Sequence, residues 1–509
     1  MHDDHVQPSR ASTSWNRSTS WNRSTSWNRS TSWNRSTSWT RHVAAVLVAV
    51  LGITVGTTAV GASSAPDVAV LVTPAGDRSA AAAAVEHAGG TVGHELAVAG
   101  AFFADVPAGA VDELQADSAI AAVTRDRAVE AMDAGAGGSG NTLEVVRGAV
   151  GATDAPASSP VGIALVDTGV ADVAGVDAYR GPDTTGGNGR DGFGHGTNMA
   201  GIIAGKDSSG FRGVASGGRL VSVATAKGDG ETSLFSVLLG LDWVWAAAPS
   251  ANIRVVNLSL GVDPMANPTT DPLVAAVEQL TRRGVVVVVA AGNRGESTGV
   301  VTSPGYAPSA ITVGASDPHG TATTADDTVS SFSPVGSTQR RVDLLAPGQS
   351  VVSLRAPGSV IDTSYPAARV DGRYFRGSGT SQAAAVVSGV VANLLTARPD
   401  LTPAQVKAVL KASAVPLAGV DANLQGAGEV NLARALTTTA PATGSLGAGF
   451  GSILDGSVWG SGSWGSGSWG SGSWGSGSWG SGSWGSGSWG SGSWGSGSWG
   501  GDAWALWRP

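Results

Sequence analysis

The chain has 509 residues, of which 42% are hydrophobic, enough for two or more domains around a large buried core. Only 14% of the residues are charged and the net charge is −8, so we expect no nucleic-acid partner. The chain has no cysteine, which excludes disulfides, thiolate nucleophiles and cysteine metal sites.

Residues 1–42 are a low-complexity leader built on the repeat STSWNR. Its alternating Arg and Trp are compatible with stacking on single-stranded nucleic acid, but a basic leader before an apolar segment is the commoner explanation. That segment is 43–65, with an apolar run over 43–53 that suits the core of a signal peptide. We predict export with cleavage near Ala62; an uncleaved anchor is the alternative. We expect no other segment to be long and apolar enough to span a membrane.

Residues 66–132 are predicted to form a small α+β domain. Its β-α-β-β-α-β order suits a ferredoxin-like unit. A glycine-rich linker follows at 133–140. The expected strands are 68–72, 92–98, 101–106 and 120–129, and the expected helices are 77–90 and 108–115.

Residues 141–436 alternate continuous apolar strands with helical segments. This pattern predicts one doubly wound α/β domain, a mostly parallel sheet with helices on both faces. The clearest strands are 161–166, 220–224, 253–258 and 285–290, and the clearest helices are 196–204, 233–248, 272–282 and 381–397.

A linker at 437–458 leads to a tail, 459–509, built on the repeat GSGSW. Its tryptophans, from Trp459 to Trp499, recur every five residues, a spacing that gathers them on no single face of a strand or helix. We expect a flexible tail. Stacking of the exposed rings on sugars or on a cell-envelope polymer is the alternative.

Three residues that can carry chemistry lie where predicted strands of the central domain end or a helix begins. Asp167 follows a buried strand, at the edge where open α/β sheets place their sites. His195 stands between glycines at a helix start, and imidazole suits proton transfer near neutral pH. Asn293 follows another buried strand and can donate an N–H to an oxyanion. Taken singly, Asp167 is more often a cap or turn residue and Asn293 is usually a turn former, while His195 has a surface histidine as its alternative.

Ser381 begins the last predicted helix, after a glycine-rich loop. Alone, it is most simply explained as a helix cap. The chain order Asp, His, Asn, Ser, however, resembles that of the subtilases, secreted subtilisin-like serine peptidases. The matching segments are Asp167-Thr-Gly, His195-Gly-Thr, Gly379-Thr-Ser381, the oxyanion segment Ala290–Asn293 and the substrate-pairing segment Asn257–Gly261.

The resemblance implies a role for each catalytic residue. Ser381 is the nucleophile, His195 its general base, and Asp167 holds the imidazole, while Asn293 and the Ser381 backbone N–H bind the oxyanion. The α+β domain would be an inhibitory propeptide, released by cleavage between Met132 and Asn141. A permanent accessory domain is the alternative.

Substrate contacts are implied by the same resemblance. Ser259, Leu260 and Gly261 would pair with the backbone of an extended polypeptide. Arg294 would lie at the rim of the pocket for the residue before the cut and disfavour Lys or Arg there. Thr302 belongs to the segment at the bottom of that pocket, where Ser303–Pro304 is a candidate cis bond.

Two positions depart from the family pattern. Gln382 follows the nucleophile where Met is common, so we expect less damage by peroxide, and Ala385 stands where Pro is common. The chemistry requires no cofactor. We predict no metal ligands, because the Asp-containing loops lack convincing calcium-ligand spacing, although structural calcium remains open.

The sequence therefore predicts an exported, monomeric serine endopeptidase that cleaves proteins and is made as a self-processing zymogen. The alternative is a catalytically silent envelope or adhesion protein that uses the same scaffold.

Overall fold

The computed structural model describes residues 66–131, 140–152, 161–265, 267–295, 301–336 and 342–442. The leader repeat, the signal segment, most of the 133–140 linker and the tryptophan tail lie outside the described residues.

The small domain has the predicted β-α-β-β-α-β order. Its antiparallel sheet has the strand order β2-β3-β1-β4. The Asp77 side chain begins the first helix by accepting a hydrogen bond from the Ser79 N–H (2.8 Å). The elements are β1 Asp67–Pro74, α2 Arg78–His87, β2 Thr91–Leu96, β3 Ala101–Pro107, the 3-10 turn Ala108–Ala110, α3 Val111–Ala116 and β4 Ile120–Arg125.

The predicted last strand of this domain, 120–129, is wrong: the structure has two strands there. β4 ends at Arg125, and β5 (Ala128–Ala131) leaves the small sheet to pair with β9 (Thr232–Ser233) and β11 (Leu260–Gly261). Asp126 marks the break because its carboxylate accepts hydrogen bonds from the backbone N–H groups of Arg127 and Phe235, both at 3.0 Å.

The large sheet confirms the predicted doubly wound, mostly parallel architecture. The strand order is β14-β13-β12-β10-β6-β8-β7, and β15 also pairs with β13. Every pair is parallel except β13 with β14. The strands are β6 Gly162–Asp167, β7 Ala178–Asp183, β8 Arg219–Ala224, β10 Ile253–Leu258, β12 Val286–Ala290, β13 Ile311–Asp317, β14 Thr328–Val329 and β15 Leu344–Pro347.

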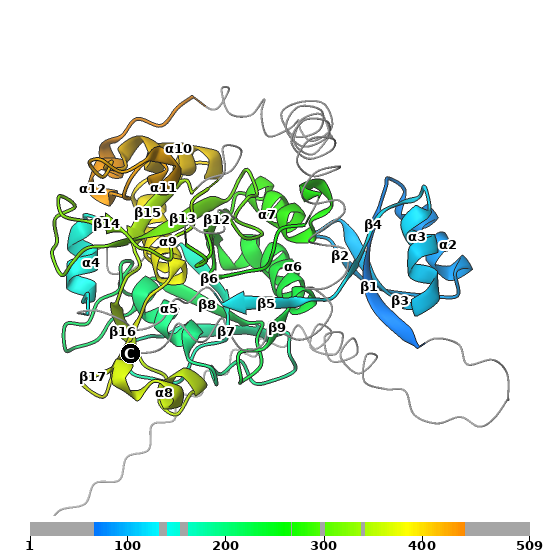
Figure 1. The fold of residues 1–509 in the computed structure, drawn as a ribbon, viewed down its shortest axis with the longest axis horizontal. Helices are drawn as coiled ribbons and strands as arrows, with labels where there is room; N and C mark the ends of the chain where they lie inside the picture. Colours follow the sequence, from blue (N-terminus) through cyan, green and yellow to red (C-terminus); the bar gives the residue numbers. More distant parts are fainter. Residues whose placement is uncertain are drawn as a thin grey trace, which may run out of the picture. The chain divides into compact units, whose positions relative to one another are not determined.

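Helices cover both faces of this sheet (Figure 1). Strand β6 shows why: Ile163 and Leu165 pack into the core with α5 and α9, whereas Ala164 and Val166 pack into the core with α6 and α7. The first face holds α4 Leu143–Ala149, α5 His195–Ala204, α9 Thr380–Ala397, α10 Pro403–Ser413 and α12 Leu432–Thr437; the second holds α6 Leu234–Ala251 and α7 Pro272–Arg282.

Smaller elements that the sequence did not predict complete the domain. They are the sheet of β16 Val351–Leu354, β18 Tyr374–Gly377 and β17 Arg369–Val370, the helices α8 Val360–Ser364 and α11 Ala422–Gln425, and the 3-10 turns Pro268–Thr270 and Pro366–Ala368.

Two helices of the described residues, α6 and α9, are long and apolar enough to cross a membrane by length and composition. The prediction that no segment beyond the signal segment is long and apolar enough to span a membrane is therefore wrong by this criterion. Both helices pack on the large sheet, which accounts for their apolar sequence.

The small domain contacts helix α6. The Val98 N–H donates to the Asp242 carboxylate (3.0 Å), and the rings of Phe103 and Phe235 lie 4.8 Å apart. Leu96 and Val98 are buried in the same apolar cluster as α6. The two domains therefore share a packed interface.

Candidate active site

Three neighbouring strands bring the predicted site residues to one edge of the large sheet. β6 pairs with β10, and β10 pairs with β12, all parallel. Asp167 ends β6, Ser259 follows β10, and Asn293 comes three residues after β12. Because adjacent strands lie about 5 Å apart, these residues leave the sheet side by side at its carboxyl edge.

Asp167 and His195 form a buried hydrogen-bonded pair. The His195 Nδ1 lies 2.7 Å from the Asp167 Oδ1, and the two residues are 1% and 4% exposed. His195 is the first residue of α5. The next residue has to be glycine, because a Cβ at Gly196 would collide with the carbonyl oxygen of Gly169. The glycine-framed histidine thus meets the carboxylate at contact distance.

Asp191 organises the loop before His195, a role that the sequence analysis missed. Its carboxylate accepts from the Gly194 N–H (2.6 Å), the Thr197 N–H (2.7 Å), and the hydroxyls of Thr197 (2.6 Å) and Thr168 (2.8 Å). Burial raises the pKa of Asp191, and these hydrogen bonds partly oppose the rise. In the sequence, only its position four residues before His195, in the segment Asp191-Gly-Phe-Gly-His195, could have indicated this role.

Ser381 is not a helix cap. Gly379 occupies the cap position of α9 without a side-chain hydrogen bond, and Ser381 is the second helical residue. The Ser381 hydroxyl donates to the carbonyl oxygen of Ser259 (3.0 Å), and the Ser259 hydroxyl donates back to the Ser381 carbonyl (3.0 Å). The start of α9 is therefore tied to the end of β10.

This tie is reinforced from β10. The Asn257 side-chain amide donates to the Ser259 hydroxyl (2.9 Å), and the Ser388 hydroxyl donates to the Asn257 Oδ1 (2.8 Å). All three side chains are fully buried. Two turns of α9 are thus held against β10, next to the strand that carries Asp167.

Asn293 lies at the same edge and is held there through its side-chain oxygen. Its Oδ1 accepts from the Thr380 backbone N–H (2.9 Å) and the Thr380 hydroxyl (3.0 Å), which fixes the orientation of the amide. The Asn293 Nδ2 is buried and has no hydrogen-bond partner among the described residues. A buried donor without an acceptor is costly, so it is suited to an oxygen supplied by a ligand.

Strand β5 occupies the groove where the sequence predicts that substrate binds. It runs antiparallel to both neighbours: Gly261 pairs with Glu130, Leu260 with Ala131, and Thr232 with Val129. The Val129 side chain is 4% exposed and belongs to the apolar cluster of α6 and Leu260. The groove therefore accepts an extended chain through its backbone and buries one apolar side chain.

The other predicted substrate contacts occupy different environments. Arg294 forms an ion pair with Asp263, close to Gly261 in the chain. Thr302 is buried, with its hydroxyl donating to the Ala291 carbonyl (3.3 Å). The Ser303–Pro304 bond is cis, as predicted. Substrate contacts of Arg294 and Thr302 remain predictions.

Gln382 is fully buried, and neither its side-chain oxygen nor its nitrogen has a hydrogen-bond partner among the described residues. The methionine that is common at this position has no such amide to satisfy. Ala385 is also fully buried, within the cluster formed by α5, α9 and the sheet.

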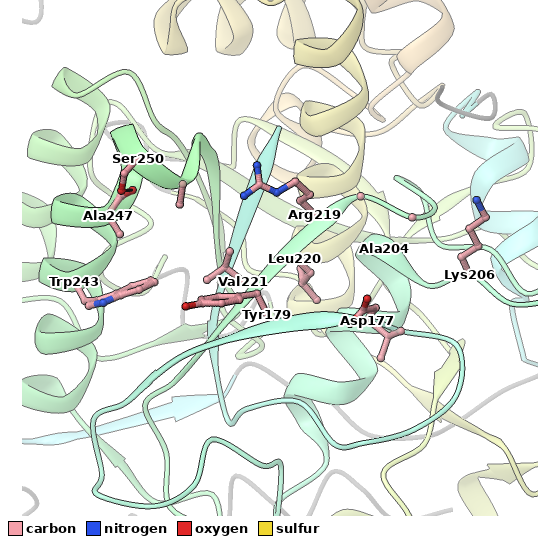
Figure 2. Close-up of a pocket in the computed structure, with 14 residues that line it drawn as sticks. Asp177, Tyr179, Ala204, Lys206, Arg219, Leu220, Val221, Trp243, Ala247 and Ser250 are labelled. Atoms are coloured by element: carbon pink, nitrogen blue, oxygen red, sulfur yellow. Dashed lines mark hydrogen bonds between the residues drawn. The ribbon is translucent and has the colours of Figure 1, made fainter. Parts of the chain in front are cut away.

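A cavity of about 800 Å³ lies away from the predicted site residues (Figure 2). It is lined by Tyr179, Trp243 and the first residues of β8, Arg219–Val221. Strand β8 ends beside Asp167, so the cavity lies a strand length away from the predicted site. In the described part of the chain, no group of three or more His, Asp or Glu side chains is arranged to hold a metal ion.

Comparison with known proteins gives one consistent result. The Subtilase family model (Peptidase_S8) matches residues 158–441. Serine protease AprX of Bacillus subtilis is 41% identical over 249 residues, 47% of this chain and 56% of AprX. Alkaline protease of Alkalihalobacillus alcalophilus is 32% identical over 331 residues, 63% of this chain and 75% of that protein.

The solved structures agree. Fervidolysin from Fervidobacterium pennivorans, described as a keratinolytic enzyme related to subtilisin, matches with a TM-score of 0.59 and 25% identity. The match covers 76% of this chain and 63% of fervidolysin, so the chain spans only part of AprX and of fervidolysin. These relatives support placing the protein among the serine endopeptidases, and the chain belongs to the subtilase family.

Proposed function

We propose that the protein is an exported serine endopeptidase that hydrolyses peptide bonds through Asp167, His195 and Ser381. The observation that carries the proposal is the buried Asp167–His195 pair (2.7 Å): Asp167 ends β6, and the neighbouring strand β10 leads to Ser259, which is hydrogen-bonded to Ser381. A carboxylate that orients an imidazole, beside a serine at a helix start, is the arrangement that nucleophilic acyl transfer requires.

In the proposed mechanism the Ser381 hydroxyl turns from the Ser259 carbonyl to His195, which takes its proton as the oxygen attacks the substrate carbonyl. Asp167 stabilises the resulting imidazolium. The Asn293 Nδ2 and the Ser381 N–H hold the negative oxygen of the tetrahedral intermediate. His195 then protonates the leaving amine, and water releases the acyl group by the same steps.

The start of α9 adds a smaller electrostatic contribution. This helix has 18 residues, and its amino end lies at Thr380 and Ser381. The positive end of the helix dipole therefore faces the developing oxyanion. Asn293 remains the principal side-chain donor.

The small domain is proposed to be an inhibitory propeptide and the chain a self-processing zymogen. Its strand β5 fills the groove between β9 and β11, which excludes any other extended chain. Ala131, the last residue of β5, pairs with Leu260, directly after Ser259, whose carbonyl accepts a hydrogen bond from the Ser381 hydroxyl. Cleavage within 132–141, whose residues 132–139 lie outside the described residues, would free the groove.

A serine-directed phosphonate probe tests the catalytic proposal. We expect the probe to label the purified protein and not the Ser381→Ala variant, and a Ser250→Ala variant, which replaces an exposed serine of α6, should still be labelled. Intact mass should show a mature form without the first 130 or so residues only when Ser381 is present. A silent adhesion protein would be labelled in neither form and would keep its full mass.

A further inference from the structure

Asp271 is a buried carboxylate, 1% exposed, whose two oxygens bind different parts of the fold. Its Oδ1 caps helix α7 by accepting hydrogen bonds from the backbone N–H groups of Leu273 (2.9 Å) and Val274 (3.4 Å). Its Oδ2 accepts from the Ser303 hydroxyl (2.8 Å) and from the Tyr306 hydroxyl. A serine would cap α7 through a single oxygen, so the second oxygen serves a purpose other than the helix.

The segment that Oδ2 holds lies beside the groove. Val262 directly follows β11 and forms an antiparallel bridge with Ser303. The Val262 N–H donates to the Ser303 carbonyl (3.0 Å), and the Ser303 N–H donates to the Val262 carbonyl (2.8 Å). Further along, the Met265 N–H donates to the Tyr306 hydroxyl (3.4 Å). The chain after β11 is therefore attached at two points to residues that this carboxylate binds.

The oxyanion donor has an anchor of its own. Asn293 is fixed by two hydrogen bonds from Thr380 of α9, and the Gly292 N–H donates to the same Thr380 hydroxyl (3.1 Å). The buried aspartate–histidine pair is held by β6 and α5. Loss of the Asp271 Oδ2 should therefore displace the edge of the groove and leave the groups of the acyl transfer in place.

The hydroxyls that bind Oδ2 depend on it for their acceptor. Ser303 is 0% exposed and Tyr306 is 5% exposed. Burial and the negative charge of Asp271 raise the pKa of Tyr306 well above its usual value, so the phenol keeps its proton and donates it to the carboxylate. Buried hydroxyls without an acceptor are costly, so removal of this oxygen favours a shift of the whole segment.

From these contacts we propose that Asp271 is a positioning residue. Through Ser303 and Tyr306 it holds the substrate-pairing strand β11 in place, so that an extended polypeptide binds in register with Ser381. The inference rests on the proposed peptidase function. Because Asp271 acts through β11, it affects substrates that pair with this strand and spares small acyl groups that do not reach it.

Two substrates, each tested on the same protein, distinguish positioning from general damage. One is an internally quenched peptide that carries residues 128–135, AVEAMDAG, and so includes the sequence of β5. The other is p-nitrophenyl acetate, an ester too small to pair with β11. Asp271→Ser keeps a cap for α7 and removes the bonds to Ser303 and Tyr306. We expect its KM for the peptide to rise about tenfold, while kcat for the peptide and the rate for the ester change by less than about twofold.

A milder variant and a matched control locate the effect. Tyr306→Phe removes one of the two bonds to Oδ2 and should raise KM by about threefold, and it should add little in the Asp271→Ser background. Thr402 caps α10, which like α7 has 11 residues and begins with a proline. Thr402→Ala should therefore lower stability without raising KM for the peptide. Rates are divided by the concentration of phosphonate-labelled sites, and intact mass verifies that the compared proteins begin at the same residue.

The outcomes separate the two proposals. An unchanged KM for the peptide in Asp271→Ser, or an equal loss for peptide and ester, overturns the positioning role and leaves the peptidase intact. Hydrolysis of the ester alone by the wild-type protein also overturns it, since the groove would then bind no extended chain. If the wild-type protein hydrolyses neither substrate and takes up no phosphonate, the proposed function itself is wrong.

Discussion

At the scale of single residues, the orientation of the Asn293 amide determines how strongly the proposed site stabilises the oxyanion. The Asn293 Oδ1 is occupied by Thr380, so the amide cannot turn over and its buried Nδ2 is left for a ligand oxygen. We expect Asn293→Ala to lower kcat by about 100–1000-fold with little change in KM, the size of the same loss in subtilisin.

Steady-state kinetics on a peptide substrate measure this effect, with Thr380→Val as the comparison. That variant keeps the Asn293 amide and the bond that it accepts from the Thr380 N–H, and removes the hydroxyl that bonds Asn293 and the Gly292 backbone, so its loss should be smaller. Equal losses in kcat for the two variants would show that Asn293 positions the helix rather than the oxyanion.

A glycine beside the histidine gives a second prediction at this scale. A Cβ at Gly196 would meet the Gly169 carbonyl, the Thr168 hydroxyl and the Asp167 carboxylate, all of them part of the packed wall behind His195. Gly196→Ala should therefore abolish phosphonate labelling. Gly228→Ala, where a Cβ meets nothing within 4 Å, should keep it. Full labelling of Gly196→Ala would contradict the tight packing of the Asp–His pair.

At the scale of elements, the sequence predicted what depends on local pattern. The strand before Asp167 is continuously apolar because both of its faces are buried, and the structure has it at Gly162–Asp167. The signatures around His195 and Ser381 announce helix starts, which the structure places at His195 and Thr380. Continuous apolar strands and glycine-marked helix starts were therefore predictable.

What the sequence missed depends on partners distant in the chain. The break between β4 and β5 arises because Asp126 binds the backbone of Phe235, more than a hundred residues later. In the sequence Asp191 resembles any loop aspartate, because the hydroxyls of Thr168 and Thr197 that donate to it are brought there only by the fold. The pairing of Arg294 with Asp263 likewise joins two loops. A local pattern of hydrophobicity cannot predict such contacts.

At the scale of the whole molecule, a buried pair of carboxyl groups couples stability to pH. Glu429 is fully buried and Asp327 is 8% exposed, and the two carboxyl groups are hydrogen-bonding neighbours, with Ser316 beside Glu429. Burial raises the pKa of Asp327 to about 6, and burial together with the negative charge of Asp327 raises the pKa of Glu429 well above its usual value. Asp317, Asp326 and His319 are the other charged groups that act on Asp327.

The sign of the coupling follows from these raised pKa values. The folded protein keeps protons that the unfolded chain releases near pH 4, so the stabilisation is complete below pH 4 and is lost as pH rises through 6 and beyond. We expect urea unfolding of the Ser381→Ala protein, which cannot digest itself, to show a loss of the order of 2 kcal/mol between pH 5 and pH 8 from this pair.

Replacing one member of the pair isolates its contribution. Glu429→Gln leaves Asp327 beside a neutral amide, which can donate to it, so stability at pH 8 should rise relative to the parent and the slope against pH should flatten. Asp400→Asn removes an exposed carboxylate and should leave the slope unchanged. A parent protein whose stability rises from pH 5 to pH 8, with the same slope in Glu429→Gln, would mean that the two carboxyl groups do not hold a proton in the folded state.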